Sequence, residues 1–339
     1  MKDSIKLSFL DTYKEYNKDD NIIVNTLRRI ADVEWSDSPD YILYSVFSDD
    51  NLLADLFAVR IFYTGENLAP DFNLCDYAIA SEKISFGDRY FRLPFYYRGE
   101  KRCRLMENRA ERIAKNPEGI DFTDRKFCNF IYSNGSANHI REDFFHYLSE
   151  NYRQVDSGGR YLNNIGGTCR EKFSFQKQYK FTIAFENTSH PGYTTEKIVD
   201  AFAADTIPVY WGDPCIVETF DPGSFILVKG EEDFPEALER IKRLDSDPAA
   251  YMEMLGKNPL LREEDRYDET VRRLEDFLRN ILSQPKEKAY RRNMEYWGKI
   301  YRERQVAYAK ALRFKKKYVN PVSGVVRKVI NKTNGNENG

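Results

Sequence analysis

The 339-residue sequence has no run of 18 or more apolar residues, so it predicts no transmembrane helix. Charges interrupt its first twenty residues and no small-residue cleavage site follows them, unlike a secretory signal. Cysteine is scarce, with five residues and no CxxC pair, which fits reduced thiols better than disulfides or zinc ligands. These absences favour a cytoplasmic protein.

Histidine and net charge are low as well. Of the three histidines, His139 and His146 could share a helical face, but a solvated helix surface is favoured over a metal site. The net charge of −2 hides a basic stretch, 286–318, with twelve Lys or Arg and three Glu. The rest of the chain is therefore acidic, so we expect no nucleic-acid partner for the main body.

Short apolar runs alternate with a helix-like stretch in the first part of the chain. The predicted strands include Ile5–Phe9, Tyr41–Phe47, Val59–Tyr63 and Tyr77–Ala80, and the predicted helix is Ile22–Ile30. Such alternation is typical of a parallel sheet covered by helices.

The pattern restarts after a charged, aperiodic stretch from 99 to 125. The elements predicted there are Phe127–Tyr132, Ile140–Leu148, Phe181–Phe185, a helix from Thr194 or Thr195 to Ala204, and Ile207–Trp211. Their short connections suit parallel strands. The sequence therefore predicts an α/β protein with two facing doubly wound domains.

The segment FENTSHPGYTTEKIVDAF lies between a predicted strand and a predicted helix, at the sheet edge where α/β proteins bind ligands. Free N–H groups and the helix dipole favour an anion there. Lys197, in the first turn, is poorly placed for a cation unless a diphosphate binds beside it. Glu196 could accept hydrogen bonds from sugar or ribose hydroxyls, and Tyr193 could pack against a ring. On spacing alone, a capped surface helix is equally supported.

Two more residues could take part in the same chemistry. Glu66, in FYTGENLAPDFN, follows a strand, where a partly shielded carboxylate can act as a general base. Arg141, in NHIRED, opens a helix, and its planar guanidinium suits phosphate oxygens. Without further information, a solvated turn glutamate and a solvated helix arginine are the favoured interpretations.

Three blocks stand in a characteristic order. They are FYTGENLAPDFNLCDYAIA with DRYFRLPFYYR, then FCNFIYSN with Arg141 after it, then QYKFTIAFEN…GYTTEKIVDAFAADTIPVYWGDP. With these blocks the sequence resembles the inverting α1,3-fucosyltransferases, particularly their soluble bacterial members. The resemblance extends over Val59–Phe225 and more weakly to Leu282.

The resemblance implies a GT-B fold, that is, two facing Rossmann-like domains, here followed by a C-terminal helical basic tail. We expect an acceptor domain over 1–125 that carries the general base, a GDP-fucose-binding domain over 126–285, and a basic amphipathic helical tail with a disordered end over 286–339. The proposed base of the family falls on Glu66. Its donor-binding positions fall on Arg141, Asn187, Tyr193, Glu196 and Lys197.

The activity implied is inverting transfer of L-fucose from GDP-β-L-fucose to O3 of GlcNAc in a β-galactosyl-GlcNAc oligosaccharide, which makes Lewis x structures. We expect no obligatory metal or cofactor, since the family meets the diphosphate with cationic side chains; a divalent ion would at most stimulate. Three alternatives stay open: another GDP-sugar, an α1,4 linkage on type 1 chains, and a non-enzymatic carbohydrate-binding module. Arg141 and Lys197 together argue against the last.

The tail carries apolar residues at helical spacing among Lys and Arg. They are Tyr290, Met294, Trp297, Tyr301, Tyr308 and Leu312. One interpretation is a helix lying on the anionic inner face of a bacterial membrane, which would make the protein peripheral. The other is a terminal helix packed against the domains with its charges solvated.

Overall fold

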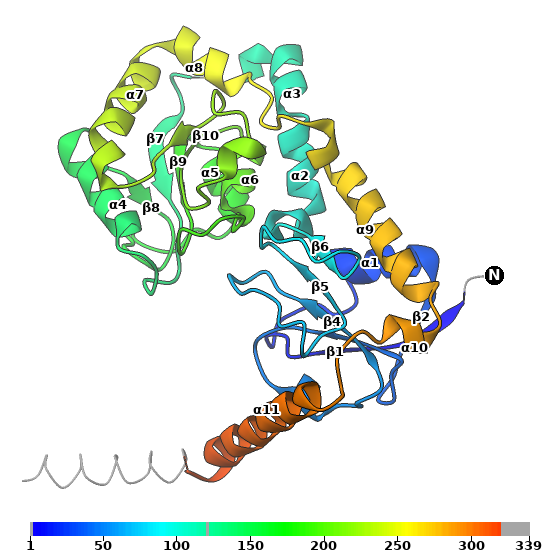
Figure 1. Ribbon diagram of the computed structural model, residues 1–339. Coiled ribbons are helices and arrows are strands. Elements are labelled where there is room, and N and C mark those ends of the chain that lie inside the picture. Colours follow the sequence, from blue (N-terminus) through cyan, green and yellow to red (C-terminus); the bar gives the residue numbers. More distant parts are fainter. Residues whose placement is uncertain (1–2, 120–121, 320–339) are drawn as a thin grey trace, which may run out of the picture.

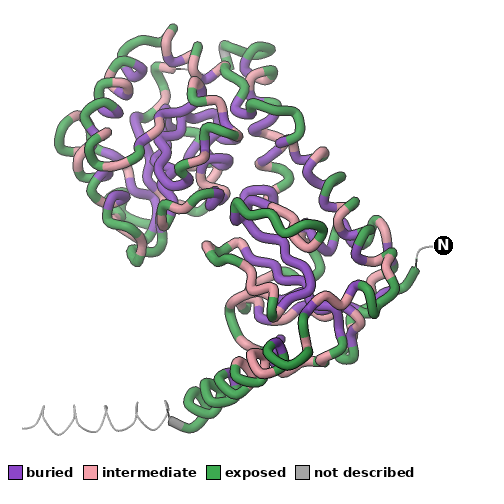
Figure 2. Tube along the Cα trace, viewed as in Figure 1, coloured by how far each residue is buried: buried purple, intermediate pink, exposed green. Residues whose placement is uncertain are grey.

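The computed structural model describes residues 3–119 and 122–319, which form two α/β domains (Figure 1). The first domain contains a six-stranded parallel sheet in the order β2-β1-β3-β4-β5-β6. Its strands are β1 (Ser4–Leu10), β2 (Asp32–Trp35), β3 (Tyr41–Tyr44), β4 (Val59–Tyr63), β5 (Tyr77–Ala80) and β6 (Tyr90–Arg92). Strands β3, β4 and β5 are buried along their whole length (Figure 2), as parallel strands covered on both faces are.

The second domain contains a five-stranded parallel sheet in the order β11-β10-β9-β7-β8. Its strands are β7 (Lys126–Phe130), β8 (Asp156–Ser157), β9 (Tyr179–Phe185), β10 (Ile207–Trp211) and β11 (Ile226–Leu227). The strand order reverses between β7 and β9, and in the first sheet it reverses between β1 and β3. Ligands of open α/β sheets bind at such reversal points, outside the carboxyl ends of the strands.

Local signals start several of the helices. The Asn21 side chain accepts a hydrogen bond from the Val24 N–H at 3.0 Å and so caps α1. The helices are α1 (Ile22–Ile30), α2 (Glu100–Glu107), α3 (Arg109–Lys115), α4 (Ile140–Asn151), α5 (Lys172–Gln176), α6 (Glu196–Ala203), α7 (Phe234–Ser246), α8 (Pro248–Leu255), α9 (Tyr267–Leu282), α10 (Lys286–Ala289) and α11 (Trp297–Phe314). Short 3-10 turns, among them η2 (Phe95–Arg98), complete the connections.

Helix α9 lies in the range expected for the second domain, 126–285, but packs against α1 of the first domain (Figure 1). Its buried residues Val271, Leu274 and Leu278 share a hydrophobic cluster with Leu7 of β1. The chain therefore returns to the first domain before residue 285. The amphipathic pattern of α9 shows that one face is buried, but not which domain it covers.

The basic tail is helical, as expected, and its first part packs against the first domain. The Arg292 guanidinium pairs with the buried Asp76 carboxylate at 3.0 Å, and the Tyr301 hydroxyl donates to Asp71 at 2.7 Å. Residues 310–318 are all exposed (Figure 2). The predicted disordered end, 320–339, lies outside the described residues. No helix in the described part of the chain is long and apolar enough to cross a membrane.

Inside the second domain, Asp245 joins α7 to β9. Its buried carboxylate accepts hydrogen bonds from Lys180 Nζ at 2.8 Å and Arg153 Nη1 at 2.7 Å. Burial raises the pKa of Asp245, but these hydrogen bonds outweigh it and hold the pKa below its ordinary value. The carboxylate therefore stabilises the fold above the unfolded-state pKa of about 3.9, and this contribution is lost as the pH falls through the lower folded-state value.

We expect Asp245→Asn to lower the free energy of unfolding by roughly 2 kcal/mol at pH 7, because charged hydrogen bonds are replaced by neutral ones. The difference from the wild type should shrink as the pH falls below about 4, because the unfolded wild-type chain then protonates this carboxyl while the folded chain keeps it ionised to a lower pH. Urea unfolding at pH 7 and pH 3 measures both values. A difference that is the same at both pH values would contradict this role of the charge.

Candidate active site

The loop between β9 and α6 lies at the reversal point of the second sheet, and a buried carboxylate organises it. Glu186, which directly follows β9, is 0% exposed. It accepts hydrogen bonds from the Thr195 N–H at 2.7 Å and from Lys197 Nζ at 2.8 Å. Burial lowers the pKa of Lys197, but the charges of Glu186 and Glu196 raise it above its ordinary value. The ammonium group is therefore charged and fixed at the N-terminus of α6.

A glycine makes room for this carboxylate. Gly212 has φ +154°, and a Cβ there would lie 2.4 Å from Glu186 Cγ, so a side chain would collide with it. The next residue, Asp213, accepts hydrogen bonds from the Gly192 N–H and the Thr194 hydroxyl, both at 2.9 Å. Two carboxylates thus fix the backbone of the loop between β9 and α6.

The start of α4 brings Arg141 to the same sheet edge. Arg141 is 2% exposed, donates to Asn187 Oδ1 at 3.2 Å, and also donates to the Asn134 carbonyl. Its guanidinium carbon lies 4.2 Å from the centroid of the Tyr132 ring. The structure thus places two of the predicted donor residues, Arg141 and Asn187, in direct contact. The interpretation of Arg141 as a solvated helix-surface residue is wrong, because its side chain is buried.

The remaining predicted residues lie around this loop. Burial raises the pKa of Tyr193, and the negative charges of Glu186 and Glu66 add to the effect. Glu66 belongs to the other domain, and its carboxylate lies within electrostatic reach of Tyr193 in the loop between β9 and α6. Burial raises the pKa of Glu196, but Lys197 outweighs it and lowers the pKa below its ordinary value. All six predicted residues therefore lie around one region between the domains.

Glu66 is exposed after the carboxyl end of β4. Its N–H donates to Thr64 Oγ1 at 3.0 Å. Its carboxylate makes no hydrogen bond or ion pair with residues 3–119 or 122–319. A carboxylate that no protein group occupies is available to accept a proton from a substrate hydroxyl.

The neighbouring glycine controls the position of this carboxylate. A Cβ on Gly65 would lie 1.9 Å from Phe95 Cδ2, so Gly65→Ala must displace the Phe95 ring or the Glu66 loop. We expect turnover to fall by roughly 10-fold to 100-fold, because small misplacements of a reacting group are costly. Steady-state kinetics measures the fall, and an unchanged turnover would show that the position of Glu66 does not matter.

Contacts between the domains hold the loop between β9 and α6 against the first sheet. His190 Nε2 lies 2.8 Å from Oε2 of Glu82, a residue that follows β5 in the first domain. Gly192 lies so near the Ser81 carbonyl oxygen that a Cβ would come within 2.6 Å of it. The loop that carries Tyr193 therefore contacts both domains.

Three features of this loop were not predicted from the sequence: Glu186, Asp213 and the Glu82–His190 pair. For Glu186, a signal was present: a carboxylate directly after a fully buried strand and before Asn187. The Glu82–His190 pair joins residues 108 positions apart, and no local pattern indicates such a contact.

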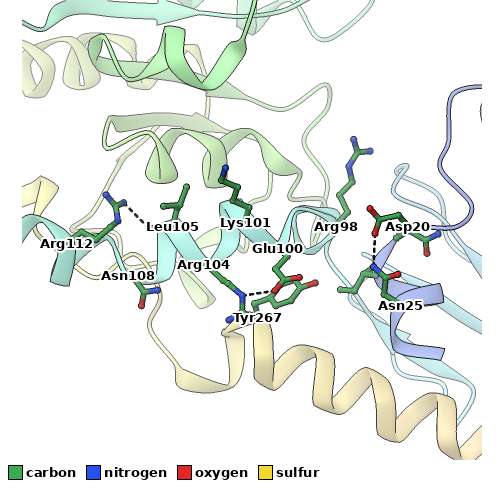
Figure 3. A pocket seen from close by; sticks show the side chains of 12 residues that line it. Asp20, Asn25, Arg98, Glu100, Lys101, Arg104, Leu105, Asn108, Arg112 and Tyr267 are labelled. Carbon is green, nitrogen blue, oxygen red and sulfur yellow. Dashed lines mark hydrogen bonds and ion pairs between the residues drawn. The ribbon is translucent and has the colours of Figure 1, made fainter. Parts of the chain in front are cut away.

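A separate cavity of about 620 Å³ lies between α1 and α2 (Figure 3). Four cations line it, and ion pairs with Glu100 and Asp205 neutralise Arg104 and Arg112 but not Arg98 and Lys101. None of the six predicted residues lines this cavity. The candidate site that the predicted residues define is therefore the loop between β9 and α6, not this cavity.

Among the described residues, no group of three His, Cys, Asp or Glu is placed to hold a metal ion. The adjacent acids Asp49 and Asp50 do not form such a group, and Asp50 pairs with Arg313 of the tail. That no metal is obligatory stays a prediction.

Two family models match successive parts of the chain. The α-(1,3)-fucosyltransferase FucT N-terminal domain matches residues 7–98, and the C-terminal region of glycosyltransferase family 10 (fucosyltransferase) matches residues 123–258. The chain belongs to glycosyltransferase family 10. The matched ranges of this family include Glu66 and all the predicted donor residues.

Two family relatives show how far the likeness extends. The α-(1,3)-fucosyltransferase FucT of Helicobacter pylori is 39% identical over 230 residues, which are 60% of this chain and 48% of that protein. The 3-galactosyl-N-acetylglucosaminide 4-α-L-fucosyltransferase FUT3 of Bos taurus is 31% identical over 176 residues, 50% of this chain and 47% of that protein. This chain therefore spans about half the length of these curated relatives.

Solved structures confirm the predicted GT-B fold. The crystal structure of an α1,3-fucosyltransferase with GDP-fucose aligns with a TM-score of 0.71 at 29% identity, covering 84% of this chain and 92% of that one. The Anabaena protein HepE in complex with UDP and glucose aligns with a TM-score of 0.53 at 13% identity, covering 82% of this chain and 99% of that one. The second likeness shows a shared fold alone.

Proposed function

We propose that this family 10 protein is an inverting α1,3-fucosyltransferase. It transfers L-fucose from GDP-β-L-fucose to O3 of GlcNAc in N-acetyllactosamine-type acceptors and so makes Lewis x structures. The observation that carries the proposal is the pair of fixed cations, Arg141 and Lys197, beside the loop of Tyr193, whose pKa the carboxylate of Glu66 in the other domain helps to raise. The likeness to an α1,3-fucosyltransferase crystallised with GDP-fucose supports the choice of donor.

The chemistry requires one base. Glu66 accepts the proton of the acceptor hydroxyl as that oxygen forms a bond to the anomeric carbon of fucose. The bond from this carbon to the diphosphate oxygen breaks on the opposite face, and GDP leaves with the electron pair. Attack from the face opposite the leaving group converts the β-linked donor into an α-linked product.

The negative charge that develops on GDP needs stabilisation rather than a proton. Arg141 and Lys197 supply two fixed positive charges, and the N-terminus of α6 adds its dipole. The hydrogen bonds to Asn187 and Glu186 hold these cations before the donor arrives. A diphosphate leaving group therefore needs no second carboxylic acid, in contrast to glycoside hydrolysis. The side chains take the part that a metal ion plays in other transferases, so we propose none as obligatory.

One experiment determines the donor, the acceptor and the linkage. GDP release is followed with GDP-fucose or GDP-mannose as donor and with type 2 or type 1 disaccharides as acceptor, and the linkages of the products are determined. We expect turnover with GDP-fucose and the type 2 chain, and a product linked to O3 of GlcNAc. Turnover with GDP-mannose but not with GDP-fucose would show that the enzyme uses another GDP-sugar as donor. A product linked to O4 on a type 1 chain would show that it makes the α1,4 linkage.

We also propose that the end of the tail binds an anionic membrane surface, which makes the protein peripheral on the inner face of the membrane. The exposed rings of Tyr308 and Phe314 lie among exposed lysines, including Lys315–Lys317. Co-sedimentation with phosphatidylglycerol vesicles should exceed that with phosphatidylcholine vesicles. Equal sedimentation with both would refute this proposal.

A further inference from the structure

Aromatic side chains gather at the reversal point of the first sheet, beside Glu66. Tyr13 follows β1, Phe47 follows β3, and Phe95 lies in η2 after β6. Together with Glu66 they line one cavity. Its volume is about 30 Å³, room for one water, so a larger ligand would rest on its rim. Strand order alone predicts a ligand at this edge of the sheet.

A chain of ring contacts connects the exposed Phe47 to the buried Phe9. Phe47 is 48% exposed, and its ring centroid lies 5.4 Å from that of Tyr13 in an edge-on arrangement. Tyr13 contacts Tyr16 in the same way at 5.3 Å, and Tyr16 contacts the buried Phe9 at 5.2 Å. Phe47 and Tyr13 are therefore supported from the core of the sheet upward.

A strained residue fixes the two loops that carry these rings. Asp11 has φ +57°, in the left-handed region, and its buried carboxylate accepts hydrogen bonds from the Ser48 hydroxyl at 2.5 Å and Asn51 Nδ2 at 2.6 Å. The loop after β1 is thereby tied to the loop after β3. The relative position of Tyr13 and Phe47 is set before any ligand binds, which lowers the entropy cost of binding. Backbone strain held in this way is typical of functional sites.

The polar groups of the cavity suit a sugar. Thr12 and Ser45 line it, and neither hydroxyl makes a hydrogen bond within the described part of the chain. Among residues 3–119 and 122–319 no cation lines the cavity and Glu66 is its one charged group, so a neutral ligand fits better than an anion. The C–H groups of a pyranose ring favour the electron-rich face of an aromatic ring, while its hydroxyls suit Thr12 and Ser45.

We propose that Thr12, Tyr13, Ser45 and Phe47, the acceptor platform, bind a neutral hexose of the acceptor oligosaccharide. One face of the sugar ring stacks on Phe47, its edge contacts the nearly perpendicular ring of Tyr13, and its hydroxyls bond to Thr12 and Ser45. The inference rests on the proposed function and adds the residues that hold the acceptor. Because Glu66 lines the same cavity, a sugar on the platform lies beside the base while the donor is held by the other domain.

The test compares Phe47→Ala with Phe57→Ala. Phe57 is a matched control, because it is 72% exposed in the same domain and does not line the cavity. We expect Phe47→Ala to raise the KM for N-acetyllactosamine roughly tenfold, the loss of one stacking contact, with kcat and GDP affinity little changed. Phe47→Trp keeps an aromatic face and should restore the KM. Circular dichroism melting checks that each variant folds.

Each outcome decides a separate point. An unchanged KM in Phe47→Ala, or an equal rise in Phe57→Ala, overturns the platform. Weaker GDP binding in Phe47→Ala also overturns it, since the rings would then hold the donor. A wild-type protein that hydrolyses GDP-fucose but transfers none to the disaccharide contradicts the proposed acceptor instead. In that case saturation-transfer NMR with GDP and N-acetyllactosamine decides: signals lost in Phe47→Ala support the platform, and equal signals overturn it.

Discussion

Replacing Glu66 by glutamine should lower the turnover of fucosyl transfer by roughly 10²-fold to 10⁴-fold, the range of a lost general base. Glutamine keeps the size of the side chain but cannot take up the proton of the attacking hydroxyl. Since the Glu66 carboxylate has no protein partner among the described residues, the substitution breaks no contact of the fold. We therefore expect unchanged thermal stability and an affinity for GDP within about twofold of the wild type.

Turnover is measured with labelled GDP-fucose and a saturating acceptor, and GDP affinity by calorimetry. Glu34→Gln is the matched control, because Glu34 is an exposed carboxylate on β2, at the far edge of the same sheet. Its turnover should equal that of the wild type. A Glu66→Gln enzyme that keeps more than about a tenth of wild-type turnover would exclude Glu66 as the base.

Lys197→Ala should lower both the free energy of unfolding and the affinity for GDP. The sequence predicts only the second effect, from a cation at a phosphate site. The structure adds the first, because Lys197 neutralises the fully buried Glu186 at 2.8 Å. Removing one partner of a buried ion pair leaves a charge without compensation, which costs roughly 3–5 kcal/mol. Loss of the diphosphate contact should lower turnover by roughly 10²-fold to 10³-fold.

A double substitution separates the two effects. In Glu186→Gln with Lys197→Ala, no buried charge remains unpaired, so most of the lost stability should return. GDP affinity should stay low, because the cation is still missing. Urea unfolding and calorimetry with GDP measure the two quantities on the same samples. If the double variant recovers GDP affinity as well, Lys197 serves only to neutralise Glu186.

Continuous apolar runs made part of the fold predictable. The strands Val59–Tyr63, Tyr77–Ala80 and Ile207–Trp211 are confirmed to the residue, since each is buried along its whole length. Strands β2 and β6 were not predicted. β2 is exposed at three of its four positions and β6 has three residues, so neither carries a clear apolar signal. Both lie at sheet edges, where pairing with a neighbour determines the strand.

The candidate site was likewise predictable from the sequence only in part. A loop after a strand and before a helix predicts an anion site at α6, and the structure places Lys197 there. Spacing alone left Arg141 as a surface residue, because its burial depends on the Tyr132 ring of the preceding loop and on Asn187, which is 46 positions away. The resemblance to a known family supplied the role of Glu66. The return of α9 to the first domain depends on packing that no local pattern encodes.

Proton NMR of the product formed from GDP-β-L-fucose and N-acetyllactosamine is the sharpest test of the proposed inverting transfer, because it reports the anomeric configuration and the linkage of the fucose. We expect α-linked fucose on O3 of GlcNAc and one GDP released for each linkage formed. A β-linked product, or release of GDP and free fucose without any linked product, would contradict it.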